Sequence, residues 1–197
     1  MEALHLQAWV IPAFLGLGLA AASGLRTFLP ITLLALAARF GLFGATLNPH
    51  AAWLTSTPFL IGLVVATIAE LAADKIPIVD HFLGLVGTIT RPAAGALAAG
   101  AVFAHLDPGT AALAGLVIGV PTALAFHAVQ SGARVVSTTT TAGIANPYLS
   151  LIEDLLSGLM AVAAIAAPVL AAVAVAGLLW LLIAVRRRRR MRRPAAG

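Results

Sequence analysis

The 197-residue sequence contains no cysteine and few charged residues. Without thiols the chain forms no disulfide, no thiolate metal ligand and no thiol nucleophile. Aspartate, glutamate, lysine and arginine make up 10% of the residues, against about 25% in a typical soluble domain. Hydrophobic residues contribute 61%, and the mean hydropathy is +1.03. This composition excludes an ordinary soluble globule and indicates an integral membrane protein, with the lipid bilayer as its first partner.

The common enzyme motifs are also missing from the sequence. It has no G-x-S-x-G, no H-E-x-x-H, no phosphate-binding P-loop and no G-x-G-x-x-G between a strand and a helix. His81 has no second histidine at the spacing of a metal site. We therefore predict no cofactor, no metal and no enzymatic activity, and keep a membrane-embedded lipid-modifying enzyme only as a third hypothesis.

The basic residues concentrate near the C-terminal end. Seven of the twelve lysines and arginines lie within positions 186–193, directly after the uncharged run 155–185. Cytoplasmic loops collect such residues, and basic clusters beside a span attract anionic lipids. We therefore predict a single transmembrane domain over residues 1–185 in the cytoplasmic (inner) membrane. The basic tail at 186–197 is expected to be cytoplasmic and to bind anionic lipids, not nucleic acid.

Uncharged runs and turn residues divide the chain into six predicted helices. They lie near residues 9–27, 30–43, 58–75, 82–105, 110–138 and 148–185. We expect the fourth helix to be interrupted at Arg91-Pro92 and the sixth to be kinked at Pro168. The predicted fold is an all-α polytopic membrane helix bundle of about six segments. Whether the bundle forms a homo-oligomer is left open.

The second predicted helix, at 30–43, is too short for a complete span. It rises about 21 Å against a hydrocarbon core of about 30 Å, so we expect it to be half of a broken or re-entrant segment. Non-helical backbone at membrane depth needs hydrogen bonds from protein or from a wet cavity. The tetrad Ser-Gly-Leu-Arg at 23–26 recurs as Ser-Gly-Ala-Arg at 131–134. An internal repeat, which is common in transporters, would explain this recurrence.

A first group of charged residues surrounds the end of the third predicted helix. Its members are Glu70, Asp74, Lys75, Asp80 and His81. Glu70 and Asp74 share one helix face, so they repel each other unless a proton, a cation or an arginine lies between them. One interpretation is a buried ion-pair network completed by Arg91 or Arg134. The others are a site for a proton or hard cation, and a cluster exposed to lipid headgroups.

A second polar group runs along one face of the helix predicted at 110–138. Its members are His127, Gln130, Ser131, Arg134 and Thr138, at the spacing of a helical stripe. Five hydroxyl residues at 137–141 and then Asn146 follow. Hydroxyls and free backbone amides beside an arginine can hold an anion such as phosphate or a carboxylate. The alternative interpretation is a polar loop outside the membrane.

Two further features have a structural and a functional interpretation. Glu153 and Asp154 lie near the start of the last predicted helix, where acidic side chains interact favourably with the helix dipole and Asn146 is a suitable N-cap. A role in binding a substrate or a coupling ion is the alternative. Arg26 lies in apolar sequence without an acidic neighbour in the chain, so it needs a partner from elsewhere in the fold, or a ligand.

The order and spacing of these motifs resemble one family over roughly residues 10–185. The matching motifs are Ser23-Gly24-x-Arg26-x-Phe28-x-Pro30, Glu70-x-x-Ala73-Asp74-Lys75-x-Pro77-x-x-Asp80-His81, Arg91-Pro92-x-x-Gly95, the hydroxyl run, and Asn146-Pro147-x-x-Ser150-x-x-Glu153-Asp154. They resemble the family catalogued as domain of unknown function 4126. The resemblance implies a small bacterial-type multi-span protein and implies no reaction.

We expect the charged groups to converge on one internal cavity of a small carrier. Its substrate would be an anionic solute or a lipid headgroup, moved together with protons or a cation. The candidate anion-binding residues are Arg26, Arg91, Arg134, Ser137, Thr138 and Asn146. The candidate coupling residues are Glu70, Asp74, Asp80, His127, Glu153 and Asp154. The alternative is a non-transporting structural or accessory membrane protein in which the same residues join helices as ion pairs.

Overall fold

The computed structural model describes residues 9–168 and, further on, residues 170, 173, 177, 180, 181, 183 and 184, without the side chains of 77–81. The helices are α2 (Ile11–Leu25), α3 (Leu29–Phe40), η2 (Leu42–Gly44), η3 (Pro49–Thr55), α4 (Thr57–Ala73), α5 (Pro77–Ala101), α6 (Pro108–Thr141) and α7 (Asn146–Ala166). The described residues contain no strand. The all-α prediction is confirmed, and a helix forms at each of the six predicted places.

Proline sets the beginning of each of the six α-helices in the described part of the chain. Each has a proline at its first or second position, where the missing N–H has no helical partner to lose and the fixed φ already fits the helix. Asp107 adds a side-chain cap to α6, since its carboxylate accepts from the Thr110 N–H at 3.0 Å. At the other end of α3, Gly41 adopts the left-handed conformation that stops a helix (φ 65°).

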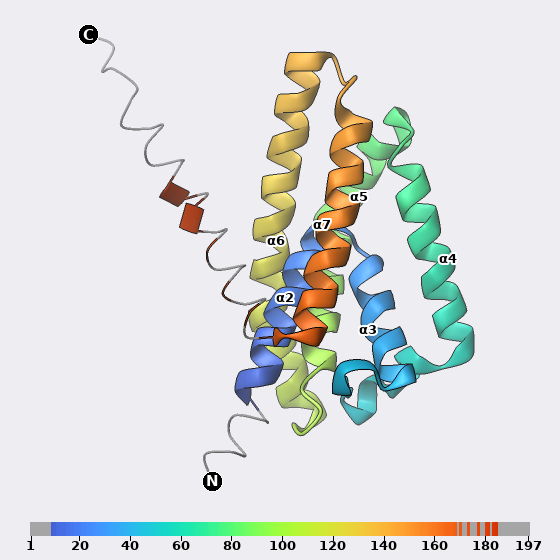
Figure 1. Cartoon of the computed structure of the whole chain (residues 1–197), viewed down its shortest axis with the longest axis vertical. Helices are drawn as coiled ribbons and strands as arrows, with labels where there is room; N and C mark the ends of the chain where they lie inside the picture. Colours follow the sequence, from blue (N-terminus) through green and yellow to red (C-terminus); the bar gives the residue numbers. More distant parts are fainter. Residues whose placement is uncertain are drawn as a thin grey trace.

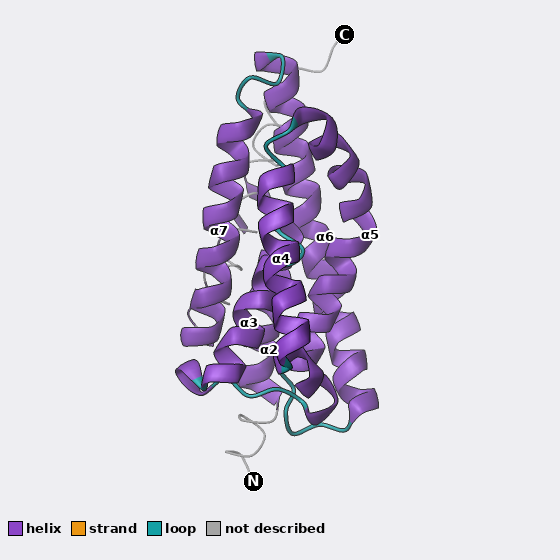
Figure 2. Ribbon diagram, turned by 90° about the vertical axis from the view of Figure 1, so that its right-hand side faces the viewer, coloured by secondary structure: helices purple, strands orange, loops and turns teal. Residues whose placement is uncertain are grey.

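Helices α4 to α7 run along the long axis of the molecule in alternating directions, whereas α2 and α3 form a shorter hairpin among them (Figures 1 and 2). The lower end of the bundle, as drawn in Figure 1, carries η2, η3 and the α5–α6 turn. Both ends of the hairpin lie there. The ring of Trp9 is 6.1 Å from that of Phe103, and the Asn48 N–H donates to the Ala101 carbonyl at 2.7 Å. The hairpin turn therefore lies inside the bundle.

The closest helix packing joins α5 to α6. A Cβ built on Gly119 would lie 2.3 Å from the Gly95 carbonyl oxygen, and one on Gly115 would lie 2.4 Å from the Ala96 carbonyl oxygen. Such contacts are possible only without side chains, and they are a common means of packing helices in membranes. Helix α2 lies centrally and packs against α5, α6 and α7. Helix α4 lies at the edge and packs mainly on α3 and η3.

The lengths of the helices bear on the number of membrane spans. Three segments are long and apolar enough to cross a bilayer: Phe82–Ala101, Pro108–Thr141 and Asn146–Ala166. The bent pair η3 and α4, which turns by 65°, would be a fourth. Helices α2 and α3, with 15 and 12 residues, are shorter. The described chain thus has the composition of a membrane helix bundle, but six complete spans are not shown.

Two prolines were predicted to disturb their helices, with different outcomes. Helix α5 continues through Pro92, so the predicted interruption at Arg91-Pro92 is wrong: the proline removes one backbone hydrogen bond, and the turns on either side keep the helix going. Helix α7 ends at Ala166, Ala167 is non-helical (φ −149°, ψ 73°), and residue 168 is helical again, so the helix is interrupted at Pro168 as expected, because a residue before proline is disfavoured in the α conformation. Most of the remainder of the helix predicted to residue 185, and the basic tail, lie outside the described residues.

Candidate functional site

The hairpin turn joins α2 to α3 through Arg26, Thr27 and Phe28. Arg26 is extended (φ −135°, ψ 128°), so the α3 N-terminus leaves backbone N–H groups without helical partners. The carboxylate of Glu70, on α4, accepts from the N–H of Thr27 at 2.7 Å and from that of Phe28 at 3.0 Å. A negative charge at a helix N-terminus also interacts favourably with the helix dipole. Glu70 therefore caps α3 from a different helix.

The carbonyl groups that end α2 are bound in the same way by side chains of α5 and α6. The Gly24 carbonyl accepts from Nη1 of Arg91 at 3.3 Å, and the Leu25 carbonyl accepts from Nε2 of Gln130 at 3.4 Å. A cation therefore lies at the C-terminus of α2 and an anion at the N-terminus of α3, which is the favourable arrangement for both dipoles. The break in the α2–α3 pair is thus supported from three other helices.

Arg26 is fully buried, with 0% of its surface exposed. Its guanidinium forms ion pairs with Asp74, the C-cap of α4, and with two acidic residues of α7, Glu153 at 3.4 Å and Asp154 at 2.6 Å. It also donates to the backbone carbonyl and the hydroxyl of Ser150 at 3.0 and 2.9 Å. The acidic partners that the sequence around Arg26 lacks therefore come from elsewhere in the fold, as expected.

Arg134 of α6 and Lys75 complete the cluster. Nη2 of Arg134 lies 2.5 Å from Glu153 Oε2 and 3.5 Å from Asp74 Oδ2, and Nζ of Lys75 lies 2.9 Å from Asp154 Oδ2. We call the cluster the charge network; its members are Arg26, Glu70, Asp74, Lys75, Arg134, Glu153 and Asp154. It brings three cations and four carboxylates together at the hairpin turn.

A second, smaller arrangement lies deeper along α6. His127 is seven residues before Arg134, which corresponds to about 10 Å along the helix axis. Its Nδ1 lies 2.9 Å from Nη1 of Arg91, and its Nε2 lies 3.4 Å from the Thr88 hydroxyl. Arg91 is buried, with 4% of its surface exposed. We call these two residues the Arg91–His127 pair.

The hydroxyl residues predicted to bind an anion form hydrogen bonds among themselves at the α6–α7 turn. Ser137 Oγ donates to Asn146 Oδ1 at 2.6 Å, and Asn146 Nδ2 donates to Thr138 Oγ1 at 3.0 Å. The hydroxyls of residues 139–141 bond to carbonyls of the preceding turn of α6. The turn is therefore internally satisfied. It borders a groove of about 370 Å³ lined in part by Ser137 and Tyr148.

Two capping predictions for the last helix are wrong. Asn146 is the first residue of α7, and Ala145 occupies the N-cap position, because the Asn146 side chain is held by Ser137 and Thr138. Glu153 and Asp154 lie seven and eight residues into the helix, beyond its first turn, and bind the charge network instead. The structure does not describe the side chain of Asp80, a predicted coupling residue.

Sequence reasoning did not assign a ligand role to Gln130 or Ser150. Gln130 donates to Glu153 at 2.7 Å, and Ser150 binds Arg26. Their positions on the same helix faces as Arg134 and Glu153 were a usable signal: Gln130 is four residues before Arg134, and Ser150 three before Glu153. Long-range contacts of this kind depend on how helices pack, which one helix's periodicity does not determine.

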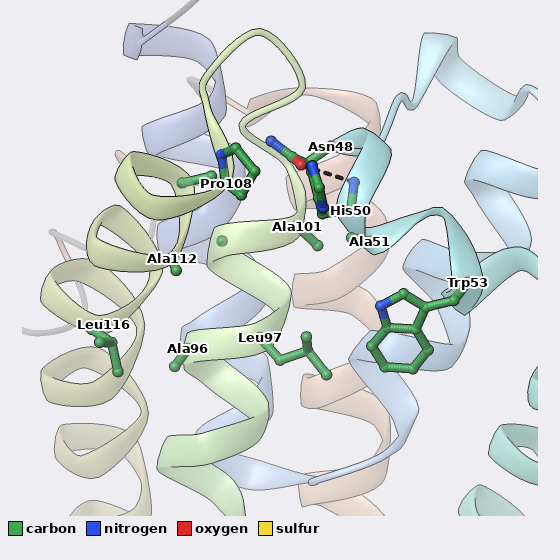
Figure 3. A pocket seen from close by; sticks show the side chains of 12 residues that line it. Asn48, His50, Ala51, Trp53, Ala96, Leu97, Ala101, Pro108, Ala112 and Leu116 are labelled. Carbon is green, nitrogen blue, oxygen red and sulfur yellow. Dashed lines mark hydrogen bonds between the residues drawn. The ribbon is translucent and has the colours of Figure 1, made fainter.

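A cavity of about 330 Å³ at the lower end also has no counterpart in the predicted sites (Figure 3). Trp53, Leu97 and Leu116 give it a mainly apolar lining, and Asn48 and His50 lie at its rim. The Asn48 amide is already used, since it donates to the Phe103 and Leu106 carbonyls at 2.9 Å. The cavity therefore offers few free polar groups to a ligand.

The fold and the charge network together define an all-helical protein of membrane type with ionisable side chains inside its bundle. Residues 13–188 match the family described as Domain of unknown function (DUF4126), and the chain belongs to that family. The match covers most of the chain and carries no assigned activity. No curated protein and no solved structure matches the chain.

Proposed function

We propose that this protein is a small membrane carrier of an anionic solute and that the charge network is its gate. The observation that carries the proposal is the broken α2–α3 pair, whose turn lies inside the bundle and whose free backbone groups are bound by charged or polar side chains of α4, α5 and α6. Interrupted helices that meet within the membrane are a recurring way to build the substrate site of a carrier. The α2–α3 hairpin would then be a re-entrant segment.

The position of α4 supports a gating role for the charge network. Helix α4 packs mainly on α3 and η3 at the edge of the bundle, and at its upper end it is joined to α6 and α7 through Asp74 and Lys75. An ion pair can be released by protonating its carboxylate or by offering its cation another anion. Helix α4 could then separate from α7 without disturbing the packed α5–α6 contact.

The residue roles follow from these contacts. Arg26 and Arg134 would exchange a protein carboxylate for the anionic solute, and Glu70 and Asp74 would take the coupling proton or cation. Release of Glu70 would also free the N–H groups that begin α3. Ser137 and Asn146 would lie at the entrance, and the basic tail would hold the C-terminus at the cytoplasmic leaflet of the inner membrane.

A flux assay tests the proposal. Proteoliposomes that contain a pH-sensitive dye receive a pulse of chloride, inorganic phosphate or succinate, and we expect at least one of them to change the internal pH. The double variant Glu70→Gln/Asp74→Asn should abolish this change. Arg39→Gln is the matched control, because Arg39 bonds to Thr55 and Thr57 at the lower end, away from the charge network. Flux that survives the double variant, or no flux with any anion, would contradict the proposal.

A permanent structural network is the second candidate, and one observation favours it. Arg26 already contacts three carboxylates and two oxygens of Ser150, so its binding capacity is used within the protein. In that case the network joins helices and nothing crosses the membrane. The charge-balanced variant Arg134→Gln/Glu153→Gln separates the two functions. A carrier would become leaky or inactive while folded, whereas a structural protein would lose stability and show no flux in either form.

A further inference from the structure

Arg91 is a buried cation that lies outside the charge network. Its guanidinium donates to the Gly24 carbonyl and contacts His127, while Nε has no hydrogen-bond partner in the described part of the chain. Among the described residues, no carboxylate lies within ion-pair distance of Arg91. A buried charge without an opposite charge in direct contact is costly, so a group that contacts Arg91 directly would stabilise it. A bound anion would be such a group.

The contact with Arg91 determines the protonation state of His127 in this arrangement. A guanidinium only donates hydrogen bonds, so Nδ1 of His127, 2.9 Å from Nη1, must accept. The imidazole is therefore neutral, with its proton on Nε2, directed to the Thr88 hydroxyl at 3.4 Å. A proton added to Nδ1 would place two donors and two positive charges face to face.

Among the side chains that the structure describes, no carboxylate near the pair could neutralise this second charge directly. The Arg91–His127 pair contacts the Gly24 carbonyl of α2 and the Thr88 hydroxyl of α5, and the Gln130 side chain on α6 interacts with His127. The charged groups that act on Arg91 from further away are Glu70, Glu153 and Arg26, all members of the charge network. These carboxylates already bind backbone N–H groups or cations.

The sum of the charges indicates the valence of the missing ligand. The described ionisable groups of the network and the pair are four cations and four carboxylates when His127 is neutral. They are Arg26, Lys75, Arg91, Arg134, Glu70, Asp74, Glu153 and Asp154. One proton on His127 leaves one uncompensated positive charge. A single monovalent anion restores neutrality, whereas a divalent anion would exceed it.

We propose that the Arg91–His127 pair binds one small monovalent anion together with one proton. The anion, a halide or a short carboxylate, would accept hydrogen bonds from the free Nε of Arg91 and from the new Nδ1–H of His127, and the two bindings would favour each other. This inference rests on the proposed carrier function and deepens it: the gate would admit one anion and one proton, and the Arg91–His127 pair would then hold both about 10 Å below the gate.

Binding to the purified full-length protein tests the inference without a transport assay. Chloride and formate are the probes, sulfate is the divalent comparison, and gluconate maintains the ionic strength. Titration calorimetry gives the Kd between pH 5.5 and 8, and a dye in weakly buffered solution counts the protons taken up. At pH values above the range in which His127 loses its proton, we expect the Kd for chloride or formate to rise about tenfold per pH unit. One proton should be bound per anion. Sulfate should bind at least about tenfold more weakly, equivalent to about 1.4 kcal/mol.

Variants assign the binding to the pair. Arg91→Gln should abolish it, and Arg91→Lys, which keeps the charge, should retain part of it. His127→Asn keeps an acceptor and a donor but cannot hold the proton, so it should remove the pH dependence. Arg39→Gln, outside the pair, should change nothing. The proton count on the wild-type protein needs no variant, so it remains decisive if Arg91→Gln fails to fold.

The outcomes separate this inference from the carrier proposal. Anion binding without proton uptake, an equal Kd at pH 5.5 and 8, or binding that survives Arg91→Gln would overturn the site. Proton-linked binding without flux in proteoliposomes would support the site and contradict carriage. Flux in the wild type that Arg91→Gln and His127→Asn leave unchanged would support carriage and overturn the site.

Discussion

The α5–α6 contact and the charge network stabilise the same bundle by opposite physical means. In the first, Gly95 and Gly119 bring two backbones together so closely that no side chain fits between them. In the second, ionisable side chains from four parts of the chain meet around a fully buried arginine. Backbone contact of the first kind has a single arrangement. Ion pairs can change partners when a proton or an anion arrives.

Helix α6 takes part in both regions, at different heights. Its lower half presents Gly115 and Gly119 to α5, and its upper half carries His127, Gln130 and Arg134. One helix therefore joins a close backbone contact to a network of ion pairs. In the proposed carrier the first would stay fixed while the second opens.

The largest expected effect is a steric one. Gly119→Leu should prevent the approach of α5 and α6, because even a Cβ at this position would meet the Gly95 carbonyl at 2.3 Å. We expect a loss of about 4 kcal/mol or more of unfolding free energy, with little folded protein recovered. Gly132→Ala on the same helix is the control, since a Cβ there meets nothing within 4 Å. Elution profiles and the Tm in detergent measure the recovery and the stability of both variants. A Gly119→Leu protein with the elution profile and Tm of the wild type would refute the close contact.

Removing the central cation of the charge network comes next. Arg26→Gln leaves Asp74, Glu153 and Asp154 without their shared partner, and we expect a loss of about 3–5 kcal/mol. Arg39→Gln removes an arginine whose hydrogen bonds are exposed and should cost less than about 1 kcal/mol. Thermal unfolding of the two variants in the same detergent measures the difference. Equal Tm values would mean that Arg26 is not paired as described.

A double-mutant cycle between Arg134 and Glu153 measures how strongly the network is coupled. Each single neutralisation leaves the other charge unbalanced, whereas Arg134→Gln/Glu153→Gln removes both charges of a 2.5 Å contact. We expect the double variant to lose about 1–3 kcal/mol less unfolding free energy than the sum of the two single losses. Additive changes in unfolding free energy would show that the two side chains do not interact.

The smallest expected effect concerns an exposed carboxylate outside both regions. The Thr110 hydroxyl and then the Thr110 N–H hold the pKa of Asp107 below its ordinary value. Because the folded-state pKa is the lower one, the stabilisation is complete above the unfolded pKa and is lost as the pH falls through the folded pKa. We expect the Tm to fall slightly in that acidic range, and Asp107→Asn to remove this part of the pH dependence. A Tm profile identical in both proteins would contradict the cap.

The helices were predictable because proline and charge mark their ends in the sequence. All six begin within five residues of the predicted positions, and the segment predicted at 30–43 is a helix of only 12 residues. Whether it is half of a broken or re-entrant span stays a prediction. The continuity of α5 at Pro92 was not predictable, since tertiary packing decides whether a helix tolerates a proline.

The candidate site was predictable in part. Burial cost alone indicated that Arg26 needs a partner from elsewhere in the fold or a ligand, and the stripe on α6 indicated one polar face. The pairing itself depends on the crossing of helices far apart in the sequence, so the choice of Asp74, Glu153 and Asp154 for Arg26 had no sequence signal. The hydrogen bonds of the hydroxyl run had no sequence signal either, because Asn146 folds back onto Ser137 and Thr138.

The recurrent Ser-Gly-x-Arg tetrad also combines a feature that supports its prediction with one that does not. Arg26 and Arg134, its two arginines, bind the same carboxylates, Asp74 and Glu153. The glycines differ: Gly24 is packed against α6, and Gly132 lies in open space. The internal repeat therefore remains a hypothesis, which the shared arginine partners favour and the glycines do not.

The absence of cysteine allows a direct test of whether the charge network opens. Thr27 lies in the hairpin turn with 7% of its surface exposed, beside Glu70. In the Thr27→Cys variant the new cysteine is the only thiol of this sequence, so a charged methanethiosulfonate added to membrane vesicles reports on that position alone. Thr140→Cys, at an exposed position, is the positive control. A gate predicts measurable labelling of Thr27→Cys under native conditions, at a rate that chloride at pH 5.5 changes. Labelling of Thr140→Cys alone, with Thr27→Cys unreactive until the protein is unfolded, would contradict a gate.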